Sequence, residues 1–393
     1  MNFEKQNFSH SLNINLIYGI DAMENNLPHL INQEKASKVF IVTDRGIVDS
    51  GILEKMTNLL SRQNLDYYVF SEVEPNPLTT TVMKAKELYL VEKCELIIAL
   101  GGGSSMDLAK AVSAVVGNGG HIMDYRRGKK FLENAGPKII AVPTTVGTGS
   151  EVTTVAVITD FEAKRKYMVS SSLIQPQYAI VDPLLTYTLP KKIVATTGMD
   201  ALVHAIESYT SNAKTSFSEG VSMQAIKMLV KYLPSSYHDE SNHEARAQVH
   251  LASTLAGIGF QYGKLGMIHS CSHPMTARHG VEHGQANAVI LPYVIQYNHV
   301  INDERFAEIA RVFDPSLHTV KDREASRNLS TIIHQFNRNL DIPDNFHYLN
   351  VDFSTEMIEQ LAEDAMNDVG TFPFNPREAT KEDVISIYNQ VLL

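Results

Sequence analysis

The chain has 393 residues and a formal charge of −10 at neutral pH, from 34 basic and 44 acidic side chains. This length exceeds the size at which single hydrophobic cores stop growing, so two domains are expected. The acidic balance, with no run of basic residues, argues against a nucleic-acid-binding surface.

Two further features bear on where the protein works. Its two cysteines, Cys94 and Cys271, are too few for a disulfide framework and are typical of a reducing compartment. The opening stretch lacks the apolar core of a secretory leader, and no later stretch approaches the roughly 18 apolar residues of a membrane span. We therefore expect a cytoplasmic protein with no membrane partner.

The first half of the chain has the pattern of an α/β domain. From residue 38, short apolar runs alternate with longer amphipathic ones, in the order KVFIVTD, ILEKMTNLLSRQ, DYYVFSEV, TTTVMKAKELYLVEK and ELIIAL. This alternation is typical of βαβ units with a parallel sheet. Four more strand-like runs follow, KIIAVPTT, EVTTVAVITD, KYMVSS and YAIVD, and the last three predict a β-rich edge.

After Pro190 the pattern changes to helices. The segments ALVHAIESY, SMQAIKMLVKYL, ARAQVHLASTLAGIGF, RFAEIARVF and EMIEQLAEDAM carry apolar residues at helical spacing. We therefore predict a Rossmann-like α/β domain over residues 1–185 and an all-α domain over residues 186–393.

A triple glycine follows the predicted strand ELIIAL, in GGGSSMDLAKAV at residues 101–112. Glycines let the backbone approach a ligand closely, and the free amides at a helix N-terminus attract phosphate oxygens. The segment is thus a candidate diphosphate cradle. A tight strand-to-helix turn that needs positive φ is the alternative, and the glycines alone do not decide between them.

Two more segments fit a nucleotide. Asp44 ends the first strand-like run, where a carboxylate can bind an adenosine ribose and repel a 2′-phosphate, which favours NAD over NADP. Taken alone, it also fits a helix cap. The stretch PTTVGTGSEVT at residues 143–153 supplies hydroxyls after another strand, although such clusters also mark plain turns.

The second half carries a candidate metal site. Asp200 and His204 are four residues apart in a predicted helix, so both side chains lie on one face. The stretch HSCSHPMTARHGVEH at residues 269–283 adds four histidines, and Pro274 is expected to kink or end a helix there. A carboxylate with three imidazoles suits a first-row divalent ion with one open position. Clustering alone does not choose which histidines bind.

Read in order, GGGSSMDLAK, PTTVGTGSEVT, GMDALVHAIESY and HSCSHPMTARHGVEHGQANAVILP closely resemble the sequence blocks of the iron-dependent (group III) alcohol dehydrogenase family. EPNP at residues 74–77 and NPREAT at residues 375–380 add to the resemblance, which spans nearly the whole chain. The chain looks nearest to the branch that holds lactaldehyde reductases and 1,3-propanediol dehydrogenases.

The resemblance implies a role for particular residues. The metal ligands would be Asp200, His204, His269 and His283, and His273 would be a non-ligand histidine beside the nicotinamide. Adenosine recognition falls to Asp44 and diphosphate contacts to Gly102, Gly103 and Ser104. Further nucleotide contacts would come from Asn76, Asp107, Thr144, Thr145, Thr148 and Lys166. It also implies a homodimer or larger assembly, with Fe(II) as the metal and Zn as the alternative.

Four residues stand outside this pattern or at its edge. His279 and Arg278 match no functional position of the family's motif. Val155 stands where some relatives carry a polar residue that faces the substrate, and this puts diol specificity in doubt. By the same comparison Phe260 would line the substrate pocket, unless it is simply a core residue.

The expected reaction is hydride transfer between NAD and a small alcohol or aldehyde, with the metal stabilising the alkoxide and His273 passing the proton. One alternative is a hydroxyacid–oxoacid transhydrogenase, in which Arg278 would hold a substrate carboxylate. A metal-dependent hydrolase is an alternative from another class, but it has no use for the glycine cradle. A non-catalytic metal- or nucleotide-binding protein is the third.

Overall fold

The structure is a computed structural model that describes residues 8, 10–163 and 165–392. Contacts divide the chain into two compact units. The first, here called the sheet unit, spans Ser11–Leu189, and the second, the helical unit, spans Pro190–Leu393 together with Met1–His10. Within the described residues, no helix combines the length and the apolar run that a membrane span requires.

A six-stranded parallel sheet forms the centre of the sheet unit, in the order β1-β8-β5-β4-β2-β3. Its four inner strands, β2, β4, β5 and β8, are near-continuous apolar runs, as expected for strands buried on both faces. The bounds are β1 Asn15–Tyr18, β2 Lys38–Val42, β3 Asp66–Phe70, β4 Leu96–Gly101, β5 Ile139–Pro143 and β8 Tyr178–Val181. The predicted parallel α/β architecture is confirmed.

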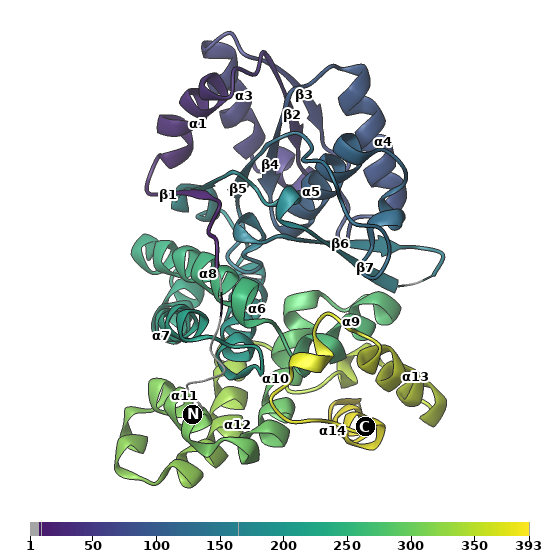
Figure 1. Cartoon of the computed structure of the whole chain (residues 1–393). Coiled ribbons are helices and arrows are strands. Elements are labelled where there is room, and N and C mark those ends of the chain that lie inside the picture. The colour runs from purple at the N-terminus through teal and green to yellow at the C-terminus, as the bar shows by residue number, and fades with distance from the viewer. Residues whose placement is uncertain (1–7, 9, 164, 393) are drawn as a thin grey trace. The chain divides into compact units, whose positions relative to one another are not determined.

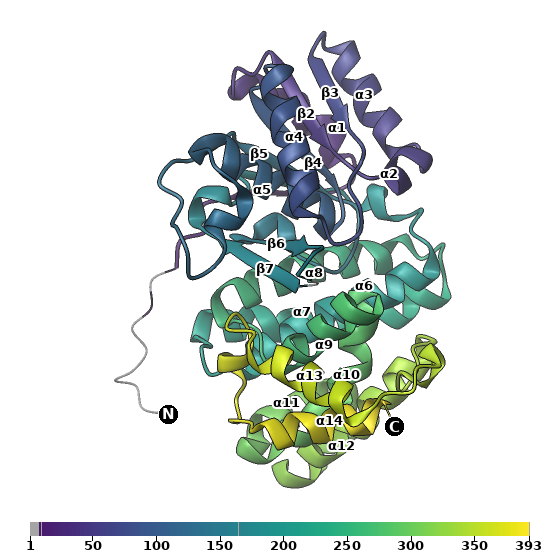
Figure 2. The same cartoon turned by 90° about the vertical axis from the view of Figure 1, so that its right-hand side faces the viewer.

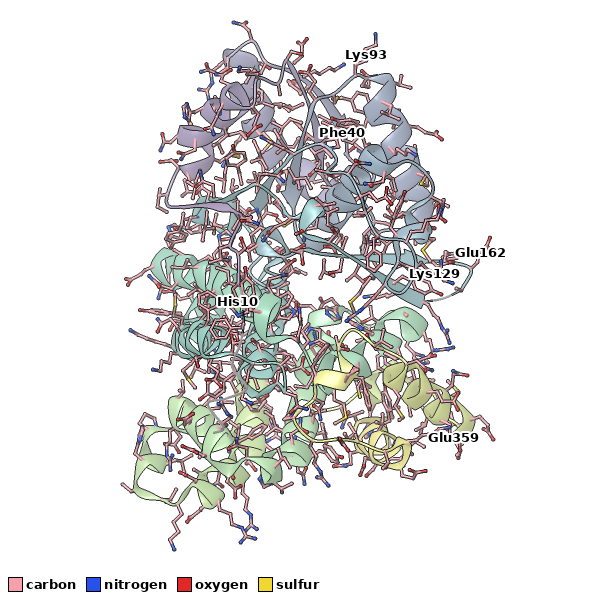
Figure 3. The ribbon with its side chains drawn as sticks, viewed as in Figure 1. His10, Phe40, Lys93, Lys129, Glu162 and Glu359 are labelled. Atoms are coloured by element: carbon pink, nitrogen blue, oxygen red, sulfur yellow. The ribbon has the colours of Figure 1, made fainter. Side chains whose placement is uncertain are left out.

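Helices cover both faces of this sheet (Figure 1). The apolar side chains of α1 (Ala22–Gln33) and α3 (Ile52–Arg62) pack in one core, and those of α4 (Thr79–Val91) and α5 (Gly103–Asn118) pack in another. Phe40 of β2 belongs to the second core, whereas Lys93, in the turn after α4, points outward (Figure 3). Shorter pieces complete the unit, namely α2 (Arg45–Asp49), η2 (Ile122–Tyr125), η3 (Ser150–Val152), η4 (Ser172–Ile174) and η5 (Pro183–Thr186).

The predicted β-rich edge is wrong in its arrangement. The run YAIVD becomes β8, which lies inside the main sheet between β1 and β5. The two runs before it form β6 (Val155–Asp160) and β7 (Arg165–Ser170), an antiparallel pair separate from the main sheet (Figure 2). The edge strands of the main sheet are β3 and β1, and β1 is a four-residue strand with a mixed polar and apolar pattern that does not stand out in the sequence.

The helical unit contains no strand among its described residues, as predicted. Its longer helices are α6 (Lys191–Thr210), α7 (Ser216–His238), α8 (His243–Gly263), α9 (Met267–His279), α10 (His283–Asn298), α11 (Asp303–Phe313), α12 (Asp322–Asn339), α13 (Thr355–Met366) and α14 (Lys381–Leu392). Single turns η6 (His299–Ile301), η7 (Pro315–Thr319), η8 (His347–Leu349) and η9 (Phe372–Phe374) connect them. Pro274 does not end its helix, because α9 continues to His279.

Gly284 lets α10 lie directly against α6. A Cβ built at this position would come within 2.3 Å of the Thr196 carbonyl oxygen of α6 and 3.3 Å of Asp200 Cβ. The nearest obstacle is backbone, which cannot move aside as a side chain would. Gly220 in α7 offers the opposite case, since a Cβ there would meet nothing within 4 Å.

We expect Gly284→Ala to destabilise the protein by about 1–3 kcal/mol, because overpacking forces two helices apart. Gly220→Ala should instead stabilise it by about 0.5–1 kcal/mol, since glycine costs helix stability. Urea unfolding monitored by circular dichroism measures both changes. Equal stability of the two variants would contradict the close approach of α6 and α10.

Candidate active site

One carboxylate oxygen in the helical unit faces three imidazole nitrogens. Asp200 Oδ1 lies 3.9 Å from His204 Nε2, 3.9 Å from His269 Nε2 and 3.8 Å from His283 Nε2. Asp200 and His204 come from α6, as the four-residue spacing predicts, while His269 lies in α9 and His283 is the first residue of α10. These helices neighbour one another in both views (Figure 1, Figure 2).

The group has the donor set and the compactness of a metal site. Ligand atoms of Asp200, His269 and His283 all lie within 4.8 Å of one another. His204 lies beside this trio, with its ring stacked on that of His269 at 4.7 Å between centroids. Asp200 is 3% exposed, and a buried carboxylate requires a compensating positive charge or hydrogen bonds. The four side chains therefore fit a first-row divalent ion.

Asn287 of α10 points its amide at the same spot. Its Nδ2 donates to Asp200 Oδ1 over 2.7 Å and lies 3.2 Å from His269 Nε2 and 3.3 Å from His283 Nε2. The three atoms therefore face one common place. Sequence analysis missed this residue, although it stands four after His283 and so shares its face of the helix.

A second carboxylate holds His269 from behind. Glu207 Oε2 lies 2.6 Å from His269 Nδ1, and the Glu207 side chain is buried. Burial alone would lower the pKa of His269, but the neighbouring Glu207 charge raises it above the usual value. Glu207 was also missed, even though it follows His204 by three residues on the same helix face.

His273 has a carboxylate partner of its own. Its Nδ1 lies 2.7 Å from Asp368 Oδ2, and its ring stacks on the ring of His283 at 5.4 Å. Burial would raise the pKa of Asp368, yet the hydrogen bond and the charge of His273 outweigh it and lower this pKa to about 2. The ionised form of Asp368 is therefore favoured. No local sequence signal pointed to it, because 95 residues separate the pair.

The unassigned residues of α9 have local partners. Arg278 Nε donates to Asp364 Oδ2 of α13 over 2.6 Å, and Arg278 Nη2 lies 2.5 Å from the same oxygen. His279 packs edge-on against Phe353 at 5.0 Å between ring centroids. Phe260 of α8 stacks on His204 at 4.5 Å, which places it against one of the candidate metal ligands.

In the sheet unit, strand register brings the two predicted nucleotide loops together. β4 and β5 pair so that Gly101 stands opposite Pro143, and Thr144 N donates to the Gly101 carbonyl over 3.0 Å. A Cβ on Gly102 would come within 3.0 Å of Thr145, and one on Gly103 within 2.7 Å of Thr148. Glycine at these two positions thus allows the glycine loop and the threonine loop to pack closely against each other.

Several polar groups at this edge suit a nucleotide. The N-terminus of α5 has no side-chain cap from its N-cap residue Gly102, which leaves backbone amides for an anion. The buried hydroxyls of Thr43 and Thr144 have no hydrogen-bond partner among the described residues. The chain also leaves β2 and β4 toward helices on opposite faces, and open α/β sheets bind ligands at such a switch point. The edge therefore fits a dinucleotide.

Asp44 caps a helix and also borders the glycine loop. Its Oδ1 accepts from Ile47 N over 3.1 Å at the start of α2. Its Oδ2 lies 3.5 Å from Ser105 Oγ and 3.2 Å from where a Cβ on Gly101 would stand. Both interpretations of this residue are therefore compatible with its position. Asn76, in a left-handed conformation with φ 59°, donates its backbone N–H to Ser104 Oγ over 3.3 Å.

Asp107 and Lys110 of α5 fasten the threonine loop. Asp107 accepts from Ser150 Oγ over 2.8 Å and from Val157 N over 3.1 Å. Lys110 Nζ donates to Ser150 Oγ, Thr153 Oγ1 and the Val155 carbonyl over 2.8–2.9 Å. Burial lowers the pKa of Lys110 to about 8, although the neighbouring Asp107 and Glu151 charges oppose this shift.

These contacts give Asp107 a clear role in loop structure, besides the nucleotide contact that the resemblance implies. Lys110 was missed, although it stands three residues after Asp107 on the same helix. Burial raises the pKa of Asp107, and the charges of Lys110 and of Lys166 in β7 oppose this shift. Val155 begins β6 and is half-buried.

Comparison with known proteins agrees with these two sites. Residues 14–183 match the family "Iron-containing alcohol dehydrogenase", and residues 194–392 match "Fe-containing alcohol dehydrogenase family, C-terminal". An NAD-dependent methanol dehydrogenase of Bacillus methanolicus is 36% identical over 92% of this chain and 94% of its own.

Two solved structures extend the comparison. A 1,3-propanediol oxidoreductase superposes with a TM-score of 0.92 at 32% identity, covering 96% of this chain and 97% of the other. A sulfoacetaldehyde reductase from Bifidobacterium kashiwanohense in complex with NAD⁺ gives a TM-score of 0.87 at 31% identity, over 98% and 99%. The chain belongs to the iron-containing alcohol dehydrogenase family.

Membership in this family makes the protein an alcohol dehydrogenase or aldehyde reductase of the iron type, with a nicotinamide nucleotide and a metal as cofactors. It confirms the resemblance drawn from the sequence. The hydrolase and transhydrogenase alternatives are not favoured. Arg278, which would have had to hold a substrate carboxylate in the second, already pairs with Asp364.

Proposed function

We propose that the protein oxidises small primary alcohols, or reduces the matching aldehydes, with NAD and a divalent metal held by Asp200, His204, His269 and His283. The observation that carries this proposal is the position of Asp200 Oδ1, 3.8–3.9 Å from the Nε2 atoms of all three histidines. The family name supports Fe(II), while the donor set also suits Zn. When bound, the metal supplies Lewis-acid stabilisation of charge on the substrate oxygen.

His273 is the proposed proton carrier. Alcohol oxidation releases a hydride to NAD⁺ and a proton from the hydroxyl group. The bond from Nδ1 to Asp368 fixes the orientation of the ring, so that Nε2 is the atom which accepts this proton. The ionised Asp368 then stabilises the imidazolium, as a buried carboxylate does behind other catalytic histidines.

We predict that His273→Ala lowers kcat for a short primary alcohol by about 10²–10⁴-fold, the usual range for a lost general base. Metal content should be unchanged, because His273 is not a proposed ligand. His279→Ala, from the same helix, is the matched control and should keep the rate. An unchanged rate and pH profile in His273→Ala would refute the role, and metal loss would make His273 a ligand instead.

The proposed nucleotide site lies at the carboxyl edge of the sheet. Phosphate oxygens would meet the amides of Gly102, Gly103 and Ser104 at the start of α5. Asn76, Asp107, Thr144, Thr145, Thr148 and Lys166 are proposed as further contacts. Preference for NAD follows from Asp44, whose carboxylate would accept ribose hydroxyls and repel a 2′-phosphate.

Asp44→Ser provides a test that separates charge from capping. Serine is a good N-cap residue, so α2 should form and stability should change little. Loss of the negative charge should shift the ratio of kcat/KM for NADP over NAD upward by about tenfold or more, equivalent to about 1.4 kcal/mol. A ratio that stays constant while the protein remains folded would leave Asp44 only its capping role.

Two residues bear on the size of the substrate. Phe260 stacks on His204 and would form an apolar wall beside the metal. Val155 is the second proposed pocket residue and offers no hydrogen bond from its side chain, which favours simple alcohols over diols. Two of the relatives are named for small alcohols, methanol and 1,3-propanediol, which supports a small substrate.

We also propose a cytoplasmic homodimer. Two buried free thiols, Cys94 and Cys271, suit a reducing compartment. The edge strand β1 exposes Leu16 and Tyr18, and Ile20 follows it at 53% exposure. An edge strand with exposed apolar side chains is a candidate surface for pairing with a second copy. Light scattering on the purified protein measures the assembly.

A further inference from the structure

Three functional carboxylate and imidazole groups occupy one stripe of α6. Asp200, His204 and Glu207 follow one another at intervals of four and three residues, so they share a face of the helix. Asp200 and Glu207 are two turns apart, or about 10 Å along the axis at 1.5 Å per residue. The first two belong to the proposed metal site, which leaves the purpose of the third to be explained.

His269 of α9 lies between the two carboxylates of this stripe. Its Nε2 faces Asp200 Oδ1 at 3.9 Å, and its Nδ1 faces Glu207 Oε2 at 2.6 Å. A neutral imidazole carries one N–H and one lone pair. Because Glu207 is an acceptor when ionised, it selects the tautomer with the proton on Nδ1 and directs the Nε2 lone pair toward Asp200.

Glu207 also holds the backbone of α9. Its other oxygen, Oε1, accepts from Ile268 N over 2.7 Å. Gly266, the N-cap residue of α9, also lies close to this oxygen, because a Cβ on Gly266 would stand 3.2 Å from it. Gly266 has no side chain that could cap α9, so Glu207 of α6 caps this helix instead. Both oxygens of one buried carboxylate therefore bind consecutive residues of α9.

We propose that Glu207 is a positioning residue for the metal centre, which fixes the ring orientation and tautomer of His269 so that Nε2 is ready for a metal ion. Carboxylates behind ligating histidines typically contribute 10–100-fold in metal affinity. The inference rests on the proposed ligation by His269. A positioning role differs from a purely structural cap, because a cap acts only on the Ile268 amide, whereas a positioning residue also acts on the His269 ring.

Glu207→Gln separates these two roles. A glutamine side chain has one acceptor oxygen and one NH₂ donor. Its oxygen can accept from either the Ile268 amide or the His269 Nδ1–H. Its NH₂ group then faces the remaining donor, with which it cannot form a hydrogen bond. If it keeps the cap, it forces His269 to protonate on Nε2, where the metal would bind. Tyr388→Phe is the matched control, since it removes a buried 2.8 Å bond to the Cys271 carbonyl of α9 without touching an imidazole.

The test is the affinity for Zn²⁺, measured by competition with a chelator on metal-free full-length protein. We expect about 10–100-fold weaker binding in Glu207→Gln and a change below about threefold in Tyr388→Phe. Equal affinities in the two variants would overturn the positioning role. His269→Ala is measured alongside, and if it keeps wild-type affinity, then the ligand set itself is wrong and the proposed metal site fails first.

A second measurement uses the unaltered protein and so does not depend on how a variant folds. In zinc-loaded protein labelled with ¹⁵N-histidine, long-range ¹H–¹⁵N spectra report which nitrogen of each ring carries hydrogen. We expect His269 to show a protonated Nδ1 in a strong hydrogen bond. A His269 ring protonated on Nε2 would overturn the proposal, whatever the affinities show.

Discussion

The helical unit is organised around a buried carboxylate that needs positive partners. Asp200 is almost fully enclosed, and a charge in that position is costly unless hydrogen bonds or a cation compensate for it. Three histidines and Asn287 converge on its Oδ1 from α6, α9 and α10. Close packing of these helices, which Gly284 permits, is thus tied to the chemistry of one oxygen atom.

Two further carboxylates lie behind the histidines. Glu207 lies behind His269, and Asp368 lies behind His273. Each carboxylate accepts from an Nδ1 atom, so both rings present Nε2 for chemistry. The proposed roles of the two rings differ, because His269 would bind the metal and His273 would carry the proton. In the sheet unit the comparable device is Lys110, whose three hydrogen bonds fasten the threonine loop beside the glycine loop.

Local patterns in the sequence were enough for some of these features. The spacing of Asp200 and His204 placed them on one helix face, and apolar runs between glycine-rich turns located β4 and β5. Features that depend on distant contacts were out of reach. Asp368 stands 95 residues from His273, and the place of β8 inside the sheet depends on which strands pair, which a single run such as YAIVD does not encode. Glu207 was within reach, because it continues the stripe of Asp200 and His204.

The most direct test of the account is turnover of metal-stripped protein with NAD and a panel of short primary alcohols and diols, before and after anaerobic addition of Fe(II) or Zn(II). We predict negligible NAD reduction without metal and recovery with at least one ion, with simple alcohols preferred over diols. Full activity in the stripped protein, or no activity with any ion, would contradict a metal-dependent dehydrogenase centred on Asp200.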